Sequence, residues 1–103
     1  QDHVKEIVST YDKRRRFMLG RLKDIGFGIN SEPDGAYYVL ANAKEFSGDS
    51  LELSRCILEE AGVAVTPGID FGKGAEGYIR FSYANNLANI KEGMDRIDNY
   101  LNN

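Results

Sequence analysis

The stretch that decides the fold is EGYIRFSYAN, residues 76–85. Its side chains alternate between two faces, which predicts a half-buried β-strand. One face carries Ile79, Phe81 and Tyr83, and the other carries Tyr78, Arg80 and Ser82. The more apolar face predicts the side that packs on the core, so Arg80 lies on the other side of the strand. An arginine is costly to bury without a partner, and we expect Arg80 either to contact water or to hold an anion.

A long amphipathic helix is predicted at the start of the sequence, because side chains recur at three- and four-residue steps. Its stripe contains Val4, Ile7, Val8, Tyr11, Arg15, Met18, Leu22 and Ile25. Gly26 predicts the end of the helix, since a left-handed cap costs least at glycine. The pattern is already present at Val4, and we expect the sequence to be a piece of a longer chain.

Two further strands are predicted. A turn at 33–35 (Pro-Asp-Gly) precedes a strand from Ala36 to about Ala41. Residues 63–65 (Val-Ala-Val) are short and partly β-branched, and they are followed by Pro67, so we predict an edge strand there. A glycine-rich loop then leads to the strand that contains Arg80.

Two more helices are predicted by their caps and spacing. Asp49 and Glu52 match a capping box at the start of a helix that Gly62 ends. Asn85 or Asn86 caps the last helix. Its apolar stripe contains Leu87, Ile90, Met94, Ile97 and Leu101.

The elements follow the order helix, strand, helix, strand, strand, helix within one domain, residues 1–103. This order predicts an α+β fold of two layers, with three helices on one face of a small, predominantly antiparallel three-stranded sheet. We expect the strand of Arg80 to lie centrally, between the strand of Tyr37 and the strand at 63–65.

Composition narrows the classes of function. Thirteen basic and sixteen acidic residues give a net charge of -3, which argues against a nucleic-acid binder and against an anionic-membrane binder. No apolar run approaches the ~20 residues of a membrane span. One cysteine cannot form a disulfide within the chain, so a cytoplasmic location is expected.

Several motifs predict no site. GKGAEG at 72–77 has the glycine spacing of a dinucleotide site, but a strand follows it where a helix is required. The basic run at 13–16 spreads around a helix and does not form one face. His3 has no second ligand at metal-binding spacing, and Cys56 has no nearby basic activator. We therefore expect no metal site and no nucleophilic cysteine.

Three segments, in this order, carry a resemblance to a known family. They are GAYYVLAN at 35–42, ILEEAGVAVTPGIDFG at 57–72 and GYIRFSYAN at 77–85. The chain resembles the small C-terminal domain of class I aminotransferases, the aspartate aminotransferase-like group of pyridoxal-phosphate enzymes. The resemblance implies that Arg80 binds the substrate α-carboxylate. It also implies that Tyr37 lines the substrate side-chain pocket, although packing against the sheet is an equally good explanation of Tyr37.

The resemblance further implies a parent enzyme that transfers an amino group between an amino acid and a 2-oxo acid. Its cofactor, pyridoxal 5'-phosphate, would be bound by a larger upstream domain, because no cofactor-binding motif and no catalytic lysine in a matching context occurs here. We therefore expect this fragment alone to be inactive. Its expected partners are the substrates, the large domain of the same chain and a second subunit of a homodimer.

Two other interpretations remain open. A pyridoxal-phosphate lyase, decarboxylase or synthase can share this domain and its carboxylate-binding arginine. A non-catalytic module that binds a small ligand or a protein is the alternative from another class.

Overall fold

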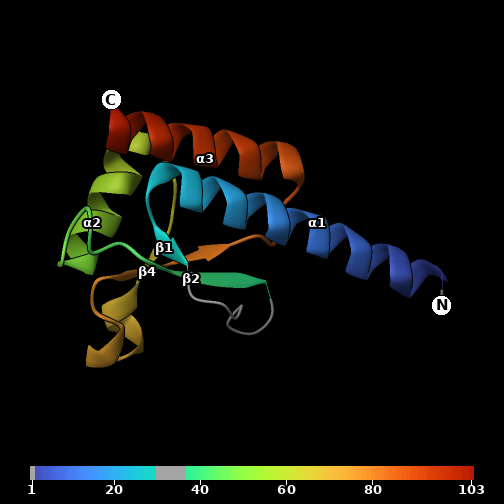
Figure 1. The fold of residues 1–103 in the computed structure, drawn as a ribbon, viewed down its shortest axis with the longest axis horizontal. Helices are drawn as coiled ribbons and strands as arrows, with labels where there is room; N and C mark the ends of the chain where they lie inside the picture. Colours follow the sequence, from blue (N-terminus) through green and yellow to red (C-terminus); the bar gives the residue numbers. More distant parts are fainter. Residues whose placement is uncertain (1, 30–36) are drawn as a thin grey trace.

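The computed structural model describes residues 2–29 and 37–103, with the side chains of 2–4 and 6–8 left out. Figure 1 shows the elements along the chain. The helices and helical turns are α1 (Asp2–Ile25), α2 (Ser50–Cys56), the π-helical turn η1 (Ile57–Ala61), the 3-10 turns η2 (Gly68–Phe71) and η3 (Lys73–Ala75), and α3 (Leu87–Asn102). The strands are β1 (Gly28–Ile29), β2 (Tyr38–Asn42), β3 (Thr66–Pro67) and β4 (Tyr78–Ser82). The turn predicted at 33–35 and the predicted strand start at Ala36 lie outside the described residues.

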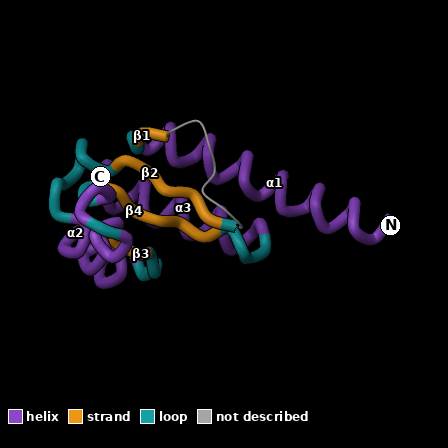
Figure 2. The backbone as a smooth tube through the Cα atoms, turned by 90° about the horizontal axis from the view of Figure 1, so that it is seen from below, coloured by secondary structure: helices purple, strands orange, loops and turns teal. Residues whose placement is uncertain are grey.

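The sheet has the order β1-β2-β4-β3, and each neighbouring pair is antiparallel (Figure 2). The predicted α+β class and the central place of the Arg80 strand, β4, are confirmed. The predicted strand count of three is wrong, because β1 adds a fourth strand in which Gly28 pairs with Asn42 and Ile29 with Ala41. Two residues are too few to show a periodicity of two, so the sequence contains no pattern for β1.

The edge strand β3 lies later in the chain than predicted. The pairing involves Thr66 with Arg80 and Pro67 with Ile79, and residues 63–65 are not part of a strand. Val63 and Val65 are instead half-buried against the core. The apolar character of Val63 and Val65 indicates that they are buried. The residue at which β3 begins to pair with β4 is decided instead by the hydrogen-bonding register. Proline is tolerated in β3 because this strand lies at the edge of the sheet.

The helix boundaries follow their caps. Gly26 adopts a φ of +123° after α1, and Phe27 N–H donates to Leu22 O at 2.9 Å. Gly62 ends η1 in the left-handed region, as predicted. Asn86 is the cap of α3, and its side-chain oxygen accepts from Asn89 N–H.

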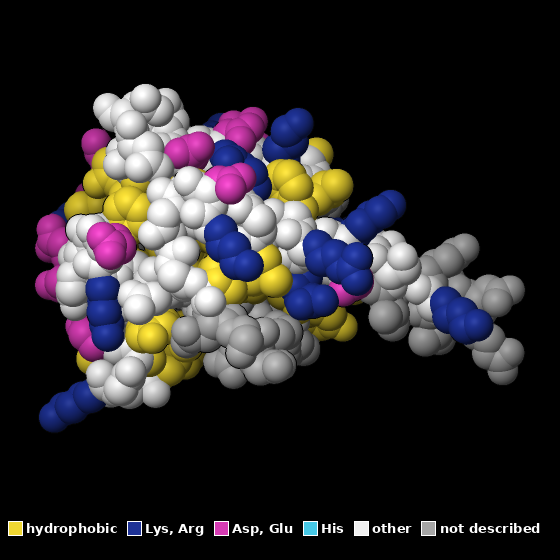
Figure 3. Space-filling model, viewed as in Figure 1, with side chains coloured by type: hydrophobic (Ala, Val, Ile, Leu, Met, Phe, Trp, Pro, Cys, Tyr) yellow, Lys and Arg dark blue, Asp and Glu magenta, His cyan; other side chains and the backbone are white. Residues whose placement is uncertain are grey.

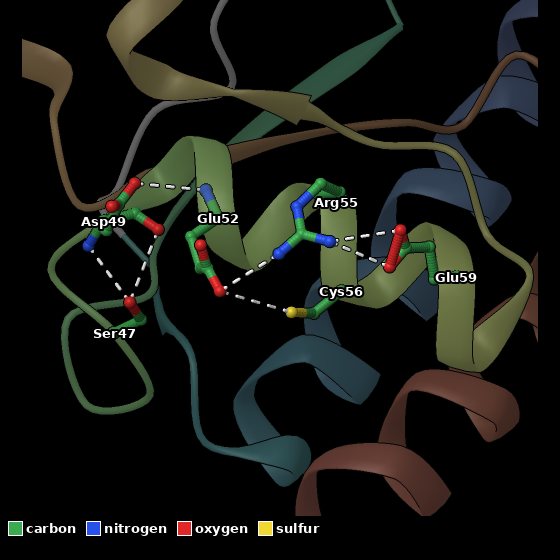
Figure 4. Close-up of polar contacts among 6 residues, drawn as sticks. All are labelled: Ser47, Asp49, Glu52, Arg55, Cys56 and Glu59. Carbon is green, nitrogen blue, oxygen red and sulfur yellow. Dashed lines mark hydrogen bonds and ion pairs between the residues drawn. The ribbon is translucent and has the colours of Figure 1, made fainter.

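One half of the predicted capping box is present at α2 (Figure 4). Asp49 Oδ1 accepts from Glu52 N–H at 3.1 Å. The reciprocal bond is replaced, because Asp49 N–H donates to Ser47 Oγ at 3.0 Å and the Glu52 carboxylate pairs with Arg55. A complete capping box would join the Asp49 N–H to the Glu52 carboxylate. These two groups instead bind the Ser47 hydroxyl and Arg55.

All three helices contribute to one core on one face of the sheet, as expected. The sheet presents Val39 and Ala41 from β2 and Ile79 and Phe81 from β4. The helices cover them with Met18, Leu22, Ile25, Leu53, Ile57, Ile90, Met94 and Ile97. The turns η2 and η3 lie on the other side of β2 and β4 from α1 and α3 (Figure 1). Of the helices described, none combines the length and the apolar character required to cross a membrane.

Candidate carboxylate-binding site

Arg80 lies in the middle of β4, on the face opposite the core. Its neighbours Ile79 and Phe81 are 0% and 2% exposed, whereas Arg80 itself is half-buried. Arg80 pairs with Leu40 on one side and Thr66 on the other, so its backbone is held by strands on both sides. The alternation in the sequence therefore predicted the face of Arg80 correctly.

Two aromatic rings lie against the Arg80 guanidinium. Its Cζ atom is 4.0 Å from the centroid of the Tyr38 ring and 4.6 Å from that of the Phe71 ring. Tyr38 stands on the same face because it is two residues from Leu40, the pairing partner of Arg80 on β2. Phe71 comes from the end of η2. Rings that contact the flat face of a guanidinium leave its N–H donors, which lie in the plane, directed outward.

The charge of Arg80 has no carboxylate partner among the side chains that the structure describes, those of residue 5, residues 9–29 and residues 37–103. Other arginines of this chain form ion pairs with Asp or Glu there: Arg15, Arg16, Arg21, Arg55 and Arg96. Arg80 contacts two rings instead, and no acceptor among the described residues receives a hydrogen bond from its side chain. This arrangement suits an anion that comes from outside the described part of the chain.

A network of hydrogen bonds holds the loop that carries Phe71. Glu76 Oε1 accepts from Ser50 N–H at 3.0 Å and from Gly77 N–H at 2.8 Å. Ser50 is completely buried, and its Oγ accepts from Ile69 N–H at 3.2 Å. The Ser50 hydroxyl and the N–H groups of Gly77 and Ser50 lower the pKa of Glu76. The start of α2 thus fixes both ends of the loop 68–77.

Gly68 allows this loop to pass close to its neighbours. A Cβ atom built at Gly68 would lie 2.0 Å from Ala75 O and 2.6 Å from Tyr78 O, both of them backbone atoms. A side chain at this position would require the loop to move. Gly68, at the start of the glycine-rich loop, therefore has a structural role in placing Phe71.

Tyr37 lies on the other side of the sheet from Arg80. The centroid of its ring is 4.4 Å from the ring centroid of Tyr11 on α1. It is 6.2 Å from the ring centroid of Tyr83, a buried residue of the core face. Its backbone has a φ of +70°, and its carbonyl accepts from Tyr83 N–H at 2.9 Å. The structure therefore brings Tyr38, and not Tyr37, to Arg80. The role of Tyr37 in a substrate pocket stays a prediction.

Tyr38 and Phe71 were missed by reasoning from the sequence. The register of β2 against β4 would have identified Tyr38, but register is not visible in a single sequence. Phe71 belongs to a glycine-rich loop, where no periodicity indicates which way a side chain points.

The basic run at 13–16 does not form an anion site. Blue side chains follow the course of α1 in Figure 3. Arg15 and Arg16 both pair with Asp12, and Arg14 lies over the ring of Tyr11 at 5.0 Å. One acid and one ring of the same helix, Asp12 and Tyr11, therefore contact three of the four cations.

The described residues do not form a site for pyridoxal phosphate. A cofactor that is linked to a lysine requires that lysine in an enclosed site. Every lysine of this chain is exposed: Lys5, Lys13, Lys23, Lys44, Lys73 and Lys91. In the part of the chain that the structure describes, no three His, Cys, Asp or Glu side chains are grouped to hold a metal.

The family model for aminotransferase class I and II matches residues 1–97. This chain belongs to that family. Aminotransferase relatives include the (5-formylfuran-3-yl)methyl phosphate transaminase of Methanocaldococcus jannaschii, which is 46% identical over 99 residues. The aspartate aminotransferase of Pyrococcus abyssi is 41% identical over 98 residues. These matches cover 96% and 95% of this chain, but only 26% and 25% of the relatives.

Solved aminotransferase structures share the fold. The aromatic aminotransferase of Pyrococcus horikoshii matches with a TM-score of 0.91 at 37% identity, over 98% of this chain and 27% of that one. An aspartate aminotransferase from Thermotoga maritima matches with a TM-score of 0.83 at 34% identity, over 96% of this chain and 25% of that one. The chain spans about a quarter of the length of the relatives it matches.

Proposed function

We propose that residues 1–103 are the small C-terminal domain of a pyridoxal-phosphate-dependent aminotransferase, and that Arg80 binds the α-carboxylate of its substrates. The parent enzyme transfers an amino group between an amino acid and a 2-oxo acid. The observation that carries this proposal is the cation of Arg80, which lies against two aromatic rings and has no carboxylate partner among the described side chains. Membership of the aminotransferase family supports the reaction.

The chemistry of a guanidinium suits this role. Its planar fork donates two parallel hydrogen bonds to a carboxylate, which fixes the orientation of the substrate as well as its position. Both substrates of an amino transfer carry the α-carboxylate, so one arginine serves both half-reactions. The cofactor, bound by the rest of the parent chain, supplies the electron sink of the reaction.

Amino transfer is favoured over the lyase, decarboxylase or synthase alternatives by the relatives, which are named as aminotransferases or transaminases. A location in the cytoplasm and a homodimer are part of the proposal for the parent enzyme. A free-standing module is disfavoured because the relatives are about four times as long as this chain.

The test is Arg80→Lys in the full-length protein that contains this chain. Lysine keeps the charge but loses the two-pronged geometry. Hydrogen bonds to charged groups contribute about 1.5–3 kcal/mol each. We therefore expect kcat/KM to fall by about tenfold to a few hundredfold for amino acids and 2-oxo acids alike. Amines without a carboxylate should be nearly unaffected.

Arg55→Lys is the matched control, because Arg55 is an exposed arginine that pairs with Glu52 and Glu59 on α2. We expect this variant to keep the activity of the unmodified protein. An equal loss on carboxylate-free amines in Arg80→Lys would contradict the proposed role of Arg80.

A further inference from the structure

We propose that Tyr38 and Phe71 are positioning residues, whose rings hold the Arg80 guanidinium in the orientation that receives a carboxylate. This inference rests on the proposed function, because it assigns two further residues to the same site. It is carried by the distances of 4.0 and 4.6 Å from Arg80 Cζ to the two ring centroids. It is also carried by the backbone contacts that hold the residue bearing each ring.

A free arginine side chain samples many rotamers, and this freedom is lost when the guanidinium binds a ligand. In the folded domain Arg80 contacts both rings. Much of its freedom is therefore lost on folding and not on binding, which strengthens binding through preorganisation. The rings also exclude water from the guanidinium, and a hydrogen bond is electrostatically stronger where water is excluded.

Both rings are fixed by the backbone. Tyr38 belongs to β2, whose register against β4 is set by five residue pairs. Phe71 ends η2, which starts at Gly68, where the backbone of the loop approaches its neighbours closely. The bond from Ile69 N–H to Ser50 Oγ holds the same turn. The backbone positions from which the two rings reach Arg80 are therefore fixed.

The exposure of Phe71 argues for a role in the site. Phe71 is 49% exposed, so its ring is poorly placed to stabilise the core. It lies outside the cluster of buried apolar residues that joins the helices to the sheet. The contact that Phe71 makes with Arg80 is consequently its most specific interaction, and its replacement should affect carboxylate binding more than folding.

The experiment uses the full-length protein and two probes of the same shape. These are 3-phenylpropionate, which carries a carboxylate, and 3-phenylpropionamide, its neutral counterpart. Their Kd values are measured by titration calorimetry for Phe71→Leu, Tyr38→Leu and Phe71→Tyr. We expect each leucine variant to weaken binding of the carboxylate by about threefold to thirtyfold, the value of an aromatic contact to a cation, and to leave the amide unchanged. Phe71→Tyr keeps the ring and should bind the carboxylate as the unmodified protein does.

Leu58→Ala is the matched control, since Leu58 is an exposed apolar side chain on η1. Its Kd values should equal those of the unmodified protein.

Arg80→Lys separates the two proposals. If Arg80→Lys weakens binding of the carboxylate relative to the amide and neither leucine variant does, the positioning role is wrong and the proposed function stands. If Arg80→Lys leaves the preference for the carboxylate at its unmodified value, or if the unmodified protein has none, both are wrong. Equal weakening of the amide in the leucine variants would show a general loss of structure and would also overturn the positioning role.

Discussion

The carboxylate of Glu76 accepts a hydrogen bond from the N–H of Ser50 at 3.0 Å, and this contact joins the loop before β4 to the first residue of α2. The Ser50 hydroxyl in turn accepts from Ile69 N–H, at the start of the turn that carries Phe71. A contact distant from Arg80 thus controls the position of a ring that touches Arg80, which leads to the first prediction.

Glu76→Gln should lower the stability of the 103-residue chain at pH 7. Hydrogen bonds from Ser50 and Gly77 depress the pKa of Glu76 in the folded state, so the ionised carboxylate contributes stability above the unfolded pKa of about 4.3. This contribution is lost as the pH falls through the lower pKa of the folded state. Urea unfolding at pH 7 and at pH 3 measures the difference between the two proteins.

We expect the difference between Glu76→Gln and the unmodified chain to shrink at the lower pH. Glu45→Gln is the control, because Glu45 is an exposed carboxylate in a loop. A stability difference for Glu76→Gln that stays constant from pH 7 to pH 3 would show that the charge of Glu76 does not matter.

Gly68→Ala should destabilise the chain by about 1–3 kcal/mol, since the added methyl group meets two backbone oxygens and the loop must move. Gly74→Ala is the matched control in the same loop, because nothing lies within 4 Å of a Cβ atom at that position. Its effect should stay within about 0.5 kcal/mol. The measurement is the free energy of unfolding in urea, and equal values for the two variants would count against the close approach at Gly68.

Arg80→Ala should cost about 1 kcal/mol or less in this chain, because it removes contacts to two rings and no ion pair. Ile79→Ala is the neighbouring control on the core face, where the side chain is 0% exposed, and we expect it to cost about 2–5 kcal/mol. Thermal and urea unfolding compare the two. A chain that unfolds when Arg80 is removed would make Arg80 a structural residue.

Tyr37→Gly should be more stable than Tyr37→Ala, by about 1 kcal/mol. Both variants lose the ring contacts to Tyr11 and Tyr83, but only alanine keeps the strain of a side chain at a φ of +70°. Glycine next to a strand is normally the less stable choice. The order of the two free energies of unfolding is therefore diagnostic, and the reverse order would exclude a left-handed backbone at this position.

Much of the fold could be read from the sequence where the signal is local. The alternation in residues 76–85 placed Ile79 and Arg80 on opposite faces, Asp49 and Gly62 marked helix ends, and the cap of α3 was narrowed to Asn85 or Asn86. These features depend on the spacing of side chains along one element or on hydrogen bonds within one turn. A single sequence contains most of that information.

The tertiary structure alone decided the site around Arg80. Tyr37 and Tyr38 are adjacent in the sequence, yet one contacts Tyr11 on α1 and the other contacts Arg80 on the opposite face. Which of them reaches Arg80 depends on the register of β2 against β4, and a shift of one residue would exchange them. Phe71 reaches Arg80 because Gly68 lets the loop pass close to the backbone of Ala75 and Tyr78. Register and close approach depend on segments that are distant in the chain, so spacing within one segment does not contain them.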